Sequence, residues 1–281
     1  MSVVEVSGGP SRAASTDDPL DADGWTRREI VLSAALLAGT PIVWELAVRI
    51  FNIPELIVPA PSAVIYALWI SFATGAIMPH LFATLSEILV GFALGSVAAL
   101  TLGCLVAQFR LFERIVYPYI VSFQAVPKIA LAPLLVIWFG FGMTSKIIMT
   151  ALVAFFPILV NTVAGLKSVE QDRLDLMGAL KATRWQTFRY VLFPTALPFI
   201  FAGLDVGVVL SVIGAIVGEF VGASRGLGYL LLFYQSELRN AYVFAILIVL
   251  AVIGMALHYV IVLAQRRLVF WSGSANRMTG L

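Results

Sequence analysis

Charged residues are scarce in this chain of 281 residues: they make up 12% of it, against about 25% in an average soluble domain. Hydrophobic residues make up 60%, and the mean hydropathy is +0.98. Too little polar surface is left to cover a water-soluble particle of this size. The composition therefore excludes a soluble globular protein and predicts an integral membrane protein.

Residues that build metal and redox sites are also few. Cys104 is the only cysteine, so an intramolecular disulfide and a cysteine metal site are excluded, and we interpret it as a packing residue. The two histidines, His80 and His258, belong to no HExxH pattern and are interpreted as structural or interfacial. We predict no catalytic residue, no metal ligand and no cofactor.

A nucleotide-binding loop is missing as well. The chain contains no GxxxxGK[ST] sequence, and in GFGMTSKI (140–147) no glycine precedes Lys146. Thr144 or Ser145 is instead expected to cap a helix that begins there. The sequence therefore predicts no P-loop for binding a nucleoside triphosphate.

Six apolar runs are long enough to cross a bilayer as helices, which requires about 20 residues. A shorter run, 62–73, is predicted to lie along the membrane surface, with Ser62 as its N-cap. Polar tails are predicted at 1–28, as a disordered cytoplasmic segment, and at 271–281, around a membrane domain at 29–270. The six predicted spans are 29–51, 81–107, 114–139, 147–166, 196–219 and 240–265.

The positions of lysine and arginine predict the orientation. With both termini in the cytoplasm, 13 of the 18 lysine and arginine residues fall on the cytoplasmic side and four on the opposite side. This asymmetry predicts a multi-pass protein of a bacterial inner membrane with cytoplasmic N- and C-termini. It also places the charged segment 169–193 in the cytoplasm.

Small residues and prolines indicate a closely packed, irregular bundle. Gly91, Gly95, Ala99 and Gly103 recur every four residues in the second span, which lets helix backbones approach. The fifth span repeats the pattern from Gly203, and prolines interrupt the third and fourth spans. Such irregular helices favour a transport path over a simple anchor.

Segment 169–193 reads as two short amphipathic helices, about 169–181 and 184–193. Capping boxes are predicted at Ser168 and Thr183, and Pro194 and Pro198 are predicted to stop the second helix. Two interpretations stay open from the residues alone. The segment is either an interfacial helix that touches anionic lipid, or a knob that another cytoplasmic protein grips.

A resemblance favours the second interpretation. This helix pair followed by LFPTALPFIFAGL resembles the coupling motif of permeases of ABC importers, of the binding-protein-dependent type with the MetI-like fold. Four further stretches resemble the branch that imports nitrate, sulfonates, taurine or thiamine precursors: VPAPSAV (58–64), VPKIALAPLLVIWFGFG (126–142), FFPILVNTVAGL (155–166) and VGEFVGASRGLGYL (217–230).

The resemblance implies an all-α, six-helix permease whose coupling segment lies between the fourth and fifth spans. It implies two cytoplasmic ATPase subunits, an extracytoplasmic substrate-binding protein, a second permease copy and a surrounding bilayer as partners, and no nucleic acid. The family's Glu-Ala-Ala is replaced here by residues 175–177, and its glycine by Lys181. The coupling residues carried over are Asp175, Met177, Leu180, Lys181, Thr183, Arg184, Trp185 and Phe188.

Polar residues inside the spans are candidates for the path itself. Lys128, Asn161 and Asp205 are proposed to line it, because an intramembrane charge is costly unless it faces protein or water. For Lys128 an alternative stays open, in which it pairs with Glu87 or Asp205 and holds helices together. An ion-gradient-coupled secondary transporter is the alternative function.

Charges near the Gly-rich stretch GASRGLG are candidates for binding-protein docking at the outer face. The alternative is that they are ordinary solvated loop charges. The substrate is expected to be a small polar or anionic solute, with a slight preference for thiamine precursors or related heterocycles. The docking candidates are Glu219, Arg225 and Arg239.

Overall fold

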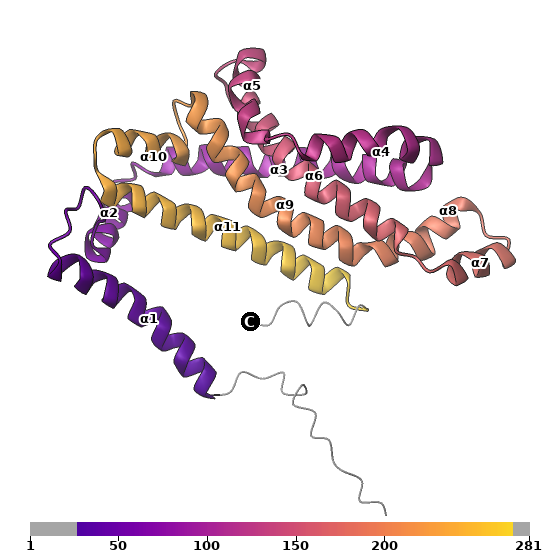
Figure 1. The fold of residues 1–281 in the computed structure, drawn as a ribbon, viewed down its shortest axis with the longest axis horizontal. Helices are drawn as coiled ribbons and strands as arrows, with labels where there is room; N and C mark the ends of the chain where they lie inside the picture. The colour runs from indigo at the N-terminus through magenta and orange to yellow at the C-terminus, as the bar shows by residue number, and fades with distance from the viewer. Residues whose placement is uncertain (1–26, 272–281) are drawn as a thin grey trace, which may run out of the picture.

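The computed structural model describes residues 27–271, and all regular elements within that range are helical (Figure 1). Four long helices run alongside one another and form the body of the protein. The predicted all-α fold is therefore confirmed. The long helices are α3 (Met78–Gln108), α6 (Met143–Lys167), α9 (Phe193–Gly222) and α11 (Asn240–Leu268).

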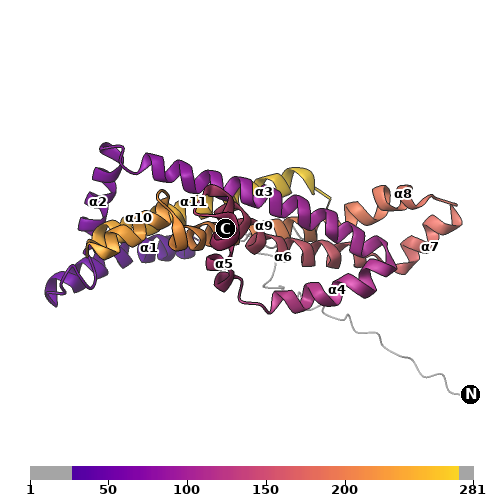
Figure 2. The ribbon, with the colours of Figure 1, turned by 90° about the horizontal axis from the view of Figure 1, so that it is seen from above.

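Shorter elements cover the two ends of this bundle. Figure 2 shows α7 and α8 projecting at one end, and α2 and α10 at the other. We call these the α7–α8 end and the α2–α10 end. The remaining elements are α1 (Arg27–Ile50), α2 (Pro61–Ala73), α4 (Arg110–Gln124), the 3-10 helix η1 (Lys128–Leu131), α5 (Ala132–Phe139), α7 (Gln171–Ala179), α8 (Arg184–Thr187), the π-helical turn η2 (Phe188–Leu192) and α10 (Leu227–Ser236).

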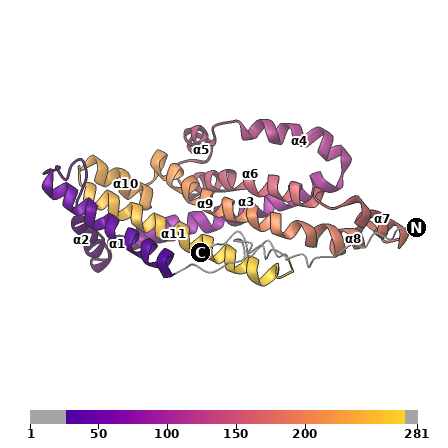
Figure 3. The same ribbon diagram turned by 60° about the horizontal axis from the view of Figure 1, so that its bottom comes forward.

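Helix α6 packs against both α3 and α9, and the three helices run together through the body of the bundle (Figure 3). Both contacts are made by the predicted glycine stripes: a Cβ added at Gly95 would lie 2.6 Å from the carbonyl oxygen of Ala151. One added at Gly203 would lie 2.8 Å from the Cβ of Asn161. The prediction that small residues bring these helices into close contact is therefore confirmed.

The third predicted span is not one helix. Residues 111–124 and 128–139 form two helical pieces bent by 90° relative to each other, so the described residues contain five helices long enough to span, or six if this pair counts as one. The prediction of a continuous helix over 114–139 is wrong. Pro127 has no backbone N–H and disfavours helical geometry at Val126, which breaks the helix there.

Two predicted helix caps are also wrong. Helix α2 begins at Pro61 after Ala60, and Ser62 instead donates its hydroxyl to Glu45 Oε1 on α1 at 2.8 Å. Helix α6 begins after Gly142 without a side-chain cap, and the Ser145 hydroxyl donates to the Gly142 carbonyl oxygen. Helix α10 was not predicted. The two predicted tails, 1–28 and 271–281, lie almost wholly outside the described residues.

Candidate functional site

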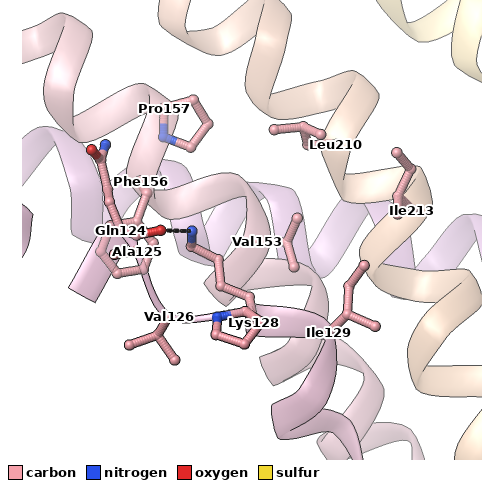
Figure 4. A pocket seen from close by; sticks show the side chains of 11 residues that line it. Gln124, Ala125, Val126, Lys128, Ile129, Val153, Phe156, Pro157, Leu210 and Ile213 are labelled. Carbon is pink, nitrogen blue, oxygen red and sulfur yellow. Dashed lines mark hydrogen bonds between the residues drawn. The ribbon is translucent and has the colours of Figure 1, made fainter. Parts of the chain in front are cut away.

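A cavity of about 570 Å³ opens where the third span breaks. Its walls are the turn 124–129, the middle of α6 and the middle of α9 (Figure 4). Irregular backbone at membrane depth is tolerated only where it is buried in protein or lines a water-filled cavity. The broken helix and the cavity therefore belong together, and this is an arrangement typical of transport paths.

Lys128 is the only charged side chain among the residues that line this pocket. Its Nζ donates to the carbonyl oxygen of Gln124 at 3.2 Å and lies 4.6 Å from the centre of the Phe156 ring (Figure 4). The carbonyl belongs to the last turn of α4, where the helix dipole favours a cation. The rest of the lining is mostly apolar: Ala125, Val126, Pro127, Ile129, Val153, Pro157, Leu210 and Ile213.

The predicted pairing of Lys128 with a carboxylate is wrong. Glu87 accepts instead from Lys146 Nζ at 2.8 Å, and Asp205 lies in contact with the His258 ring. The break at Pro127 turns Lys128 into the pocket, away from both carboxylates. Of the two interpretations of Lys128, the structure therefore excludes the one in which it holds helices together through a carboxylate.

Asn161 and Asp205, predicted beside Lys128, do not line this pocket. Asn161 donates its amide to the Pro157 carbonyl oxygen at 2.8 Å and packs against Gly203. Asp205 joins α9 to α11 through His258, and both side chains are about a third exposed. These polar groups therefore serve the helix contacts beside the pocket.

The α7–α8 segment presents apolar side chains to solvent at one end of the bundle. Leu180 is 69% exposed and Trp185 65% exposed, and the Trp185 ring stacks on Phe188 at 5.7 Å. An exposed cluster of large apolar side chains on a charged segment is typical of a protein-binding surface. Asp175, Lys181 and Arg184 are exposed around it, and Met177 is half-buried.

The bend of this segment is well defined. Thr183 forms the predicted capping box: its hydroxyl accepts from the Gln186 N–H, and the Gln186 side chain accepts from the Thr183 N–H at 2.7 Å. Lys181 has a φ of 53°, a left-handed conformation that glycine adopts most easily. The residue that replaces the family's glycine therefore keeps the glycine-like backbone.

Two local predictions here are wrong. Helix α7 begins at Gln171 after Glu170, and the Ser168 hydroxyl donates to the Gly165 carbonyl oxygen instead of capping it. Pro194 and Pro198 do not stop the second helix, which continues from Arg184 to Gly222. The π-helical turn η2 ends at Leu192, two residues before Pro194, and accommodates the missing N–H and the ring.

At the α2–α10 end, the three docking candidates differ in how far their side chains are exposed to solvent. Arg225 is exposed in the loop before α10, and the Arg239 guanidinium lies 4.1 Å from the Tyr242 ring centre, with half of its side chain exposed. Glu219 is only 1% exposed. The prediction of Glu219 as a docking residue is therefore wrong, because its carboxylate is held inside the bundle.

The sequence of this bundle matches a known family. Residues 91–270 match the family described as binding-protein-dependent transport system inner membrane component, which covers more than half of the chain. The chain belongs to this family of ABC transporter permeases. A permease of this family is a multi-pass membrane subunit and not an enzyme, and ATP hydrolysis belongs to separate ATPase subunits of the transporter complex.

Individual relatives agree with this assignment. The permease is 38% identical over 233 residues to the riboflavin transport system permease protein RibX of Chloroflexus aurantiacus, covering 83% of this chain and 87% of that protein. It is 38% identical over 214 residues to the formylaminopyrimidine transport permease protein ThiX of Halalkalibacterium halodurans, covering 76% and 85%.

A solved structure supports the fold. The MetNI methionine ABC transporter in an inward-facing conformation superimposes with a TM-score of 0.55 at 22% identity, over 66% of this chain and 94% of that one. The predicted MetI-like fold is confirmed. Family membership also favours the ATP-driven transporter over the alternative of a secondary transporter.

Proposed function

We propose that this permease forms the substrate path of an ATP-driven importer, and that the pocket at Lys128 is a substrate-contacting station on that path. The observation that carries the proposal is the single cationic side chain in an otherwise mostly apolar pocket at a broken span. A discontinuous helix near the middle of the bundle is how many transporters build a polar site inside the membrane.

The chemistry of this pocket suits a planar heterocycle with a carbonyl or anionic group. Lys128 Nζ supplies hydrogen-bond donors and a positive charge, and Phe156 supplies a ring face next to it. RibX is named for riboflavin and ThiX for formylaminopyrimidine, and both solutes are heterocycles of this kind. We therefore propose a heterocyclic solute as the substrate class.

Coupling to ATP hydrolysis is proposed to occur at the α7–α8 segment. The exposed Leu180 side chain and the Trp185–Phe188 pair form an apolar knob that fits a groove on a partner ATPase subunit. Two such subunits and a second copy of this permease complete the proposed transporter. ATP-driven closure of the ATPases shifts the population between inward-facing and outward-facing states.

This arrangement requires the α7–α8 end to face the cytoplasm. The excess of lysine and arginine on that side, 13 residues against four, supports this orientation, with both termini cytoplasmic. The α2–α10 end then faces outward. There Arg225 and Arg239 are proposed to receive an extracytoplasmic binding protein.

Of the two arginines, Arg239 lies in the environment that is more typical of a protein-binding residue. Its guanidinium carbon lies 4.1 Å from the Tyr242 ring centre and 5.5 Å from that of Tyr234, beside a pair of rings that stack at 4.8 Å. Burial raises the pKa of Tyr234, so the phenol stays neutral beside the arginine. Arginine and tyrosine are the residues that most often dominate protein–protein binding energy.

The pocket proposal is tested with Lys128→Met in the complete transporter reconstituted in liposomes. We expect ATP hydrolysis and thermal stability to be retained, and uptake of a heterocyclic substrate to fall at least tenfold, which corresponds to about 1.4 kcal/mol. Lys128→Arg is the matched control, because it keeps the charge in the same place. Normal uptake by Lys128→Met would refute a substrate-contacting role for the pocket.

A further inference from the structure

Three buried charged side chains meet at the α2–α10 end, about 10 Å from the pocket along α6. Glu87 on α3, Lys146 on α6 and Glu219 on α9 are 1%, 6% and 1% exposed. None of them takes part in the proposed substrate path. Burial of three ionisable groups together is costly, so their arrangement requires a physical explanation.

Glu219 holds the loop before α10 against α3. Its Oε1 accepts from the Thr84 hydroxyl at 2.6 Å, and its Oε2 accepts from the Gly228 N–H. The Thr84 oxygen in turn accepts from the Leu227 N–H at 2.7 Å. The loop backbone lies so close that a Cβ at Gly226 would be 2.2 Å from the Glu219 Cδ. The carboxyl of Glu219 thus supports the loop that carries Arg225.

The charges of this cluster do not balance if all three groups are ionised. Lys146 Nζ donates to Glu87 Oε1 at 2.8 Å and to the backbone carbonyl oxygen of Arg225 at 3.5 Å. Two carboxylates then face one ammonium group in a region without solvent. The net charge of the buried cluster would be −1.

One atom of the cluster also lacks a partner. Glu87 Oε2 is buried and has no hydrogen bond to any of the residues 27–271, while the Glu219 side chain lies close enough to interact with Glu87. An unsatisfied buried carboxylate oxygen is expensive. A single hydrogen between the two carboxyl groups would satisfy this oxygen and remove the excess charge at the same time.

We propose that Glu219 is a proton-binding site: it carries a proton at neutral pH and donates it in a hydrogen bond to Glu87 Oε2. The cluster is then a neutral chain of carboxylic acid, carboxylate and ammonium. The proton keeps the α9–α10 loop, residues 223–226, closed on α3. Loss of the proton places two carboxylates opposite each other and loosens the loop.

Other ionisable groups lie around the cluster, but none of them supplies the positive charge that would balance the second carboxylate. His80 Nδ1 lies 3.1 Å from the Gly226 nitrogen, and its ring stacks on Tyr229. The Arg225 side chain is exposed, so its charge is screened by water. The groups that face Glu219 and its loop are Glu87, His80, Lys146, Arg225 and Tyr229.

Infrared spectroscopy of the purified full-length permease tests the proposal without any transport assay. We expect the carbonyl stretch of a protonated carboxylic acid at neutral pH, and its loss in Glu219→Gln. Glu87→Gln should also abolish it, because Glu219 then ionises and pairs with Lys146. Glu170→Gln is the matched control: its side chain is 73% exposed at the α7–α8 end, so the stretch should persist.

The dependence of the melting temperature on pH provides a second test of the proposal. The unfolded chain releases this proton in the ordinary range of a glutamate, whereas the folded state keeps it at neutral pH. The melting temperature should therefore fall as the pH rises above that ordinary range, until Glu219 ionises in the folded state as well. In Glu219→Gln this fall should be smaller, because no proton is released there. The proposal is overturned if the wild-type protein shows no protonated carboxyl stretch at neutral pH. It is equally overturned if a folded Glu219→Gln protein keeps that stretch.

Discussion

The contact between α3 and α6 leaves no room for a side chain at Gly95. An added Cβ would lie 2.6 Å from the carbonyl oxygen of Ala151 and 3.1 Å from its Cα. Both are backbone atoms, so no side-chain rotation relieves the overlap. Since an ordinary C···O contact is about 3.3 Å, Gly95→Ala must separate the two helices by about 0.7 Å.

The expected cost follows from this displacement. Inserting a methyl group into a tightly packed contact typically costs about 1–3 kcal/mol, and the better helix propensity of alanine offsets up to about 1 kcal/mol of it. We therefore expect a net loss of stability of up to about 2 kcal/mol. Uptake should fall as well, because Val153 and Phe156 on the same helix α6 line the pocket.

Gly254→Ala on α11 is the matched control. The same substitution there meets nothing within 4 Å, so only the gain in helix propensity remains. Melting temperatures measured in one lipid or detergent should be lower for Gly95→Ala than for wild type, and unchanged or higher for Gly254→Ala. Equal stability of the two variants would refute the argument that backbone contact limits this position.

Four further predictions address the proposed coupling, orientation and docking. Trp185→Asp should leave the permease folded but abolish substrate-stimulated ATP hydrolysis by the complex, since it spoils the exposed apolar knob; full activity would contradict coupling at this segment. Lys181→Gly should raise the melting temperature, because glycine avoids a cost of about 1 kcal/mol at φ 53°; a lower melting temperature would show that the lysine side chain makes a stabilising contact. In a Cys104→Ser background, a cysteine at Ala76 should react with an impermeant thiol reagent in intact cells, and one at Arg173 only after permeabilisation; the reverse pattern would overturn the orientation. Changing Arg225 and Arg239 to Glu should weaken docking of the binding protein and its dependence on salt, whereas unchanged affinity at every ionic strength would leave them as solvated loop charges.

Features that depend on near neighbours could be predicted from the sequence. The capping box at Thr183 needs only residues three apart, and the glycine stripe around Gly95 needs only helical periodicity. The lengths of the apolar runs predicted five of the six spans as single helices. In each case the physical cause lies within one helix, so the pattern alone carries it.

Features that depend on residues far apart in the chain could not be predicted from the sequence. Glu219 looked like an outer-face charge because its partner Thr84 is 135 residues away, and Lys128 was paired with the wrong groups because Lys146 takes Glu87 across 59 residues. The continuity of the helical span from α8 through η2 into α9 was missed for a different reason. A π-helical turn that absorbs a proline has no sequence pattern of its own.

The way the helices pack restricts how this permease opens its pocket. Helices α3 and α6 are in close contact at Gly95, and α6 and α9 at Gly203, in both cases with backbone or Cβ atoms. Sliding or separating these three helices would therefore disrupt close-packed contacts. The turn 124–129 is held differently: its residues are largely exposed, and Lys128 Nζ contacts the Gln124 carbonyl within the turn and the Phe156 ring on α6. A motion that widens the pocket therefore costs least when this turn swings away from α6 and α9. Elements α8, η2 and α9 form one continuous helical span from Arg184, beside the proposed coupling knob, to Gly222, so a push at the α7–α8 end moves the pocket wall at Leu210 and the loop support at Glu219 together. The proposed ATPase, substrate and binding-protein sites thus share one rigid element.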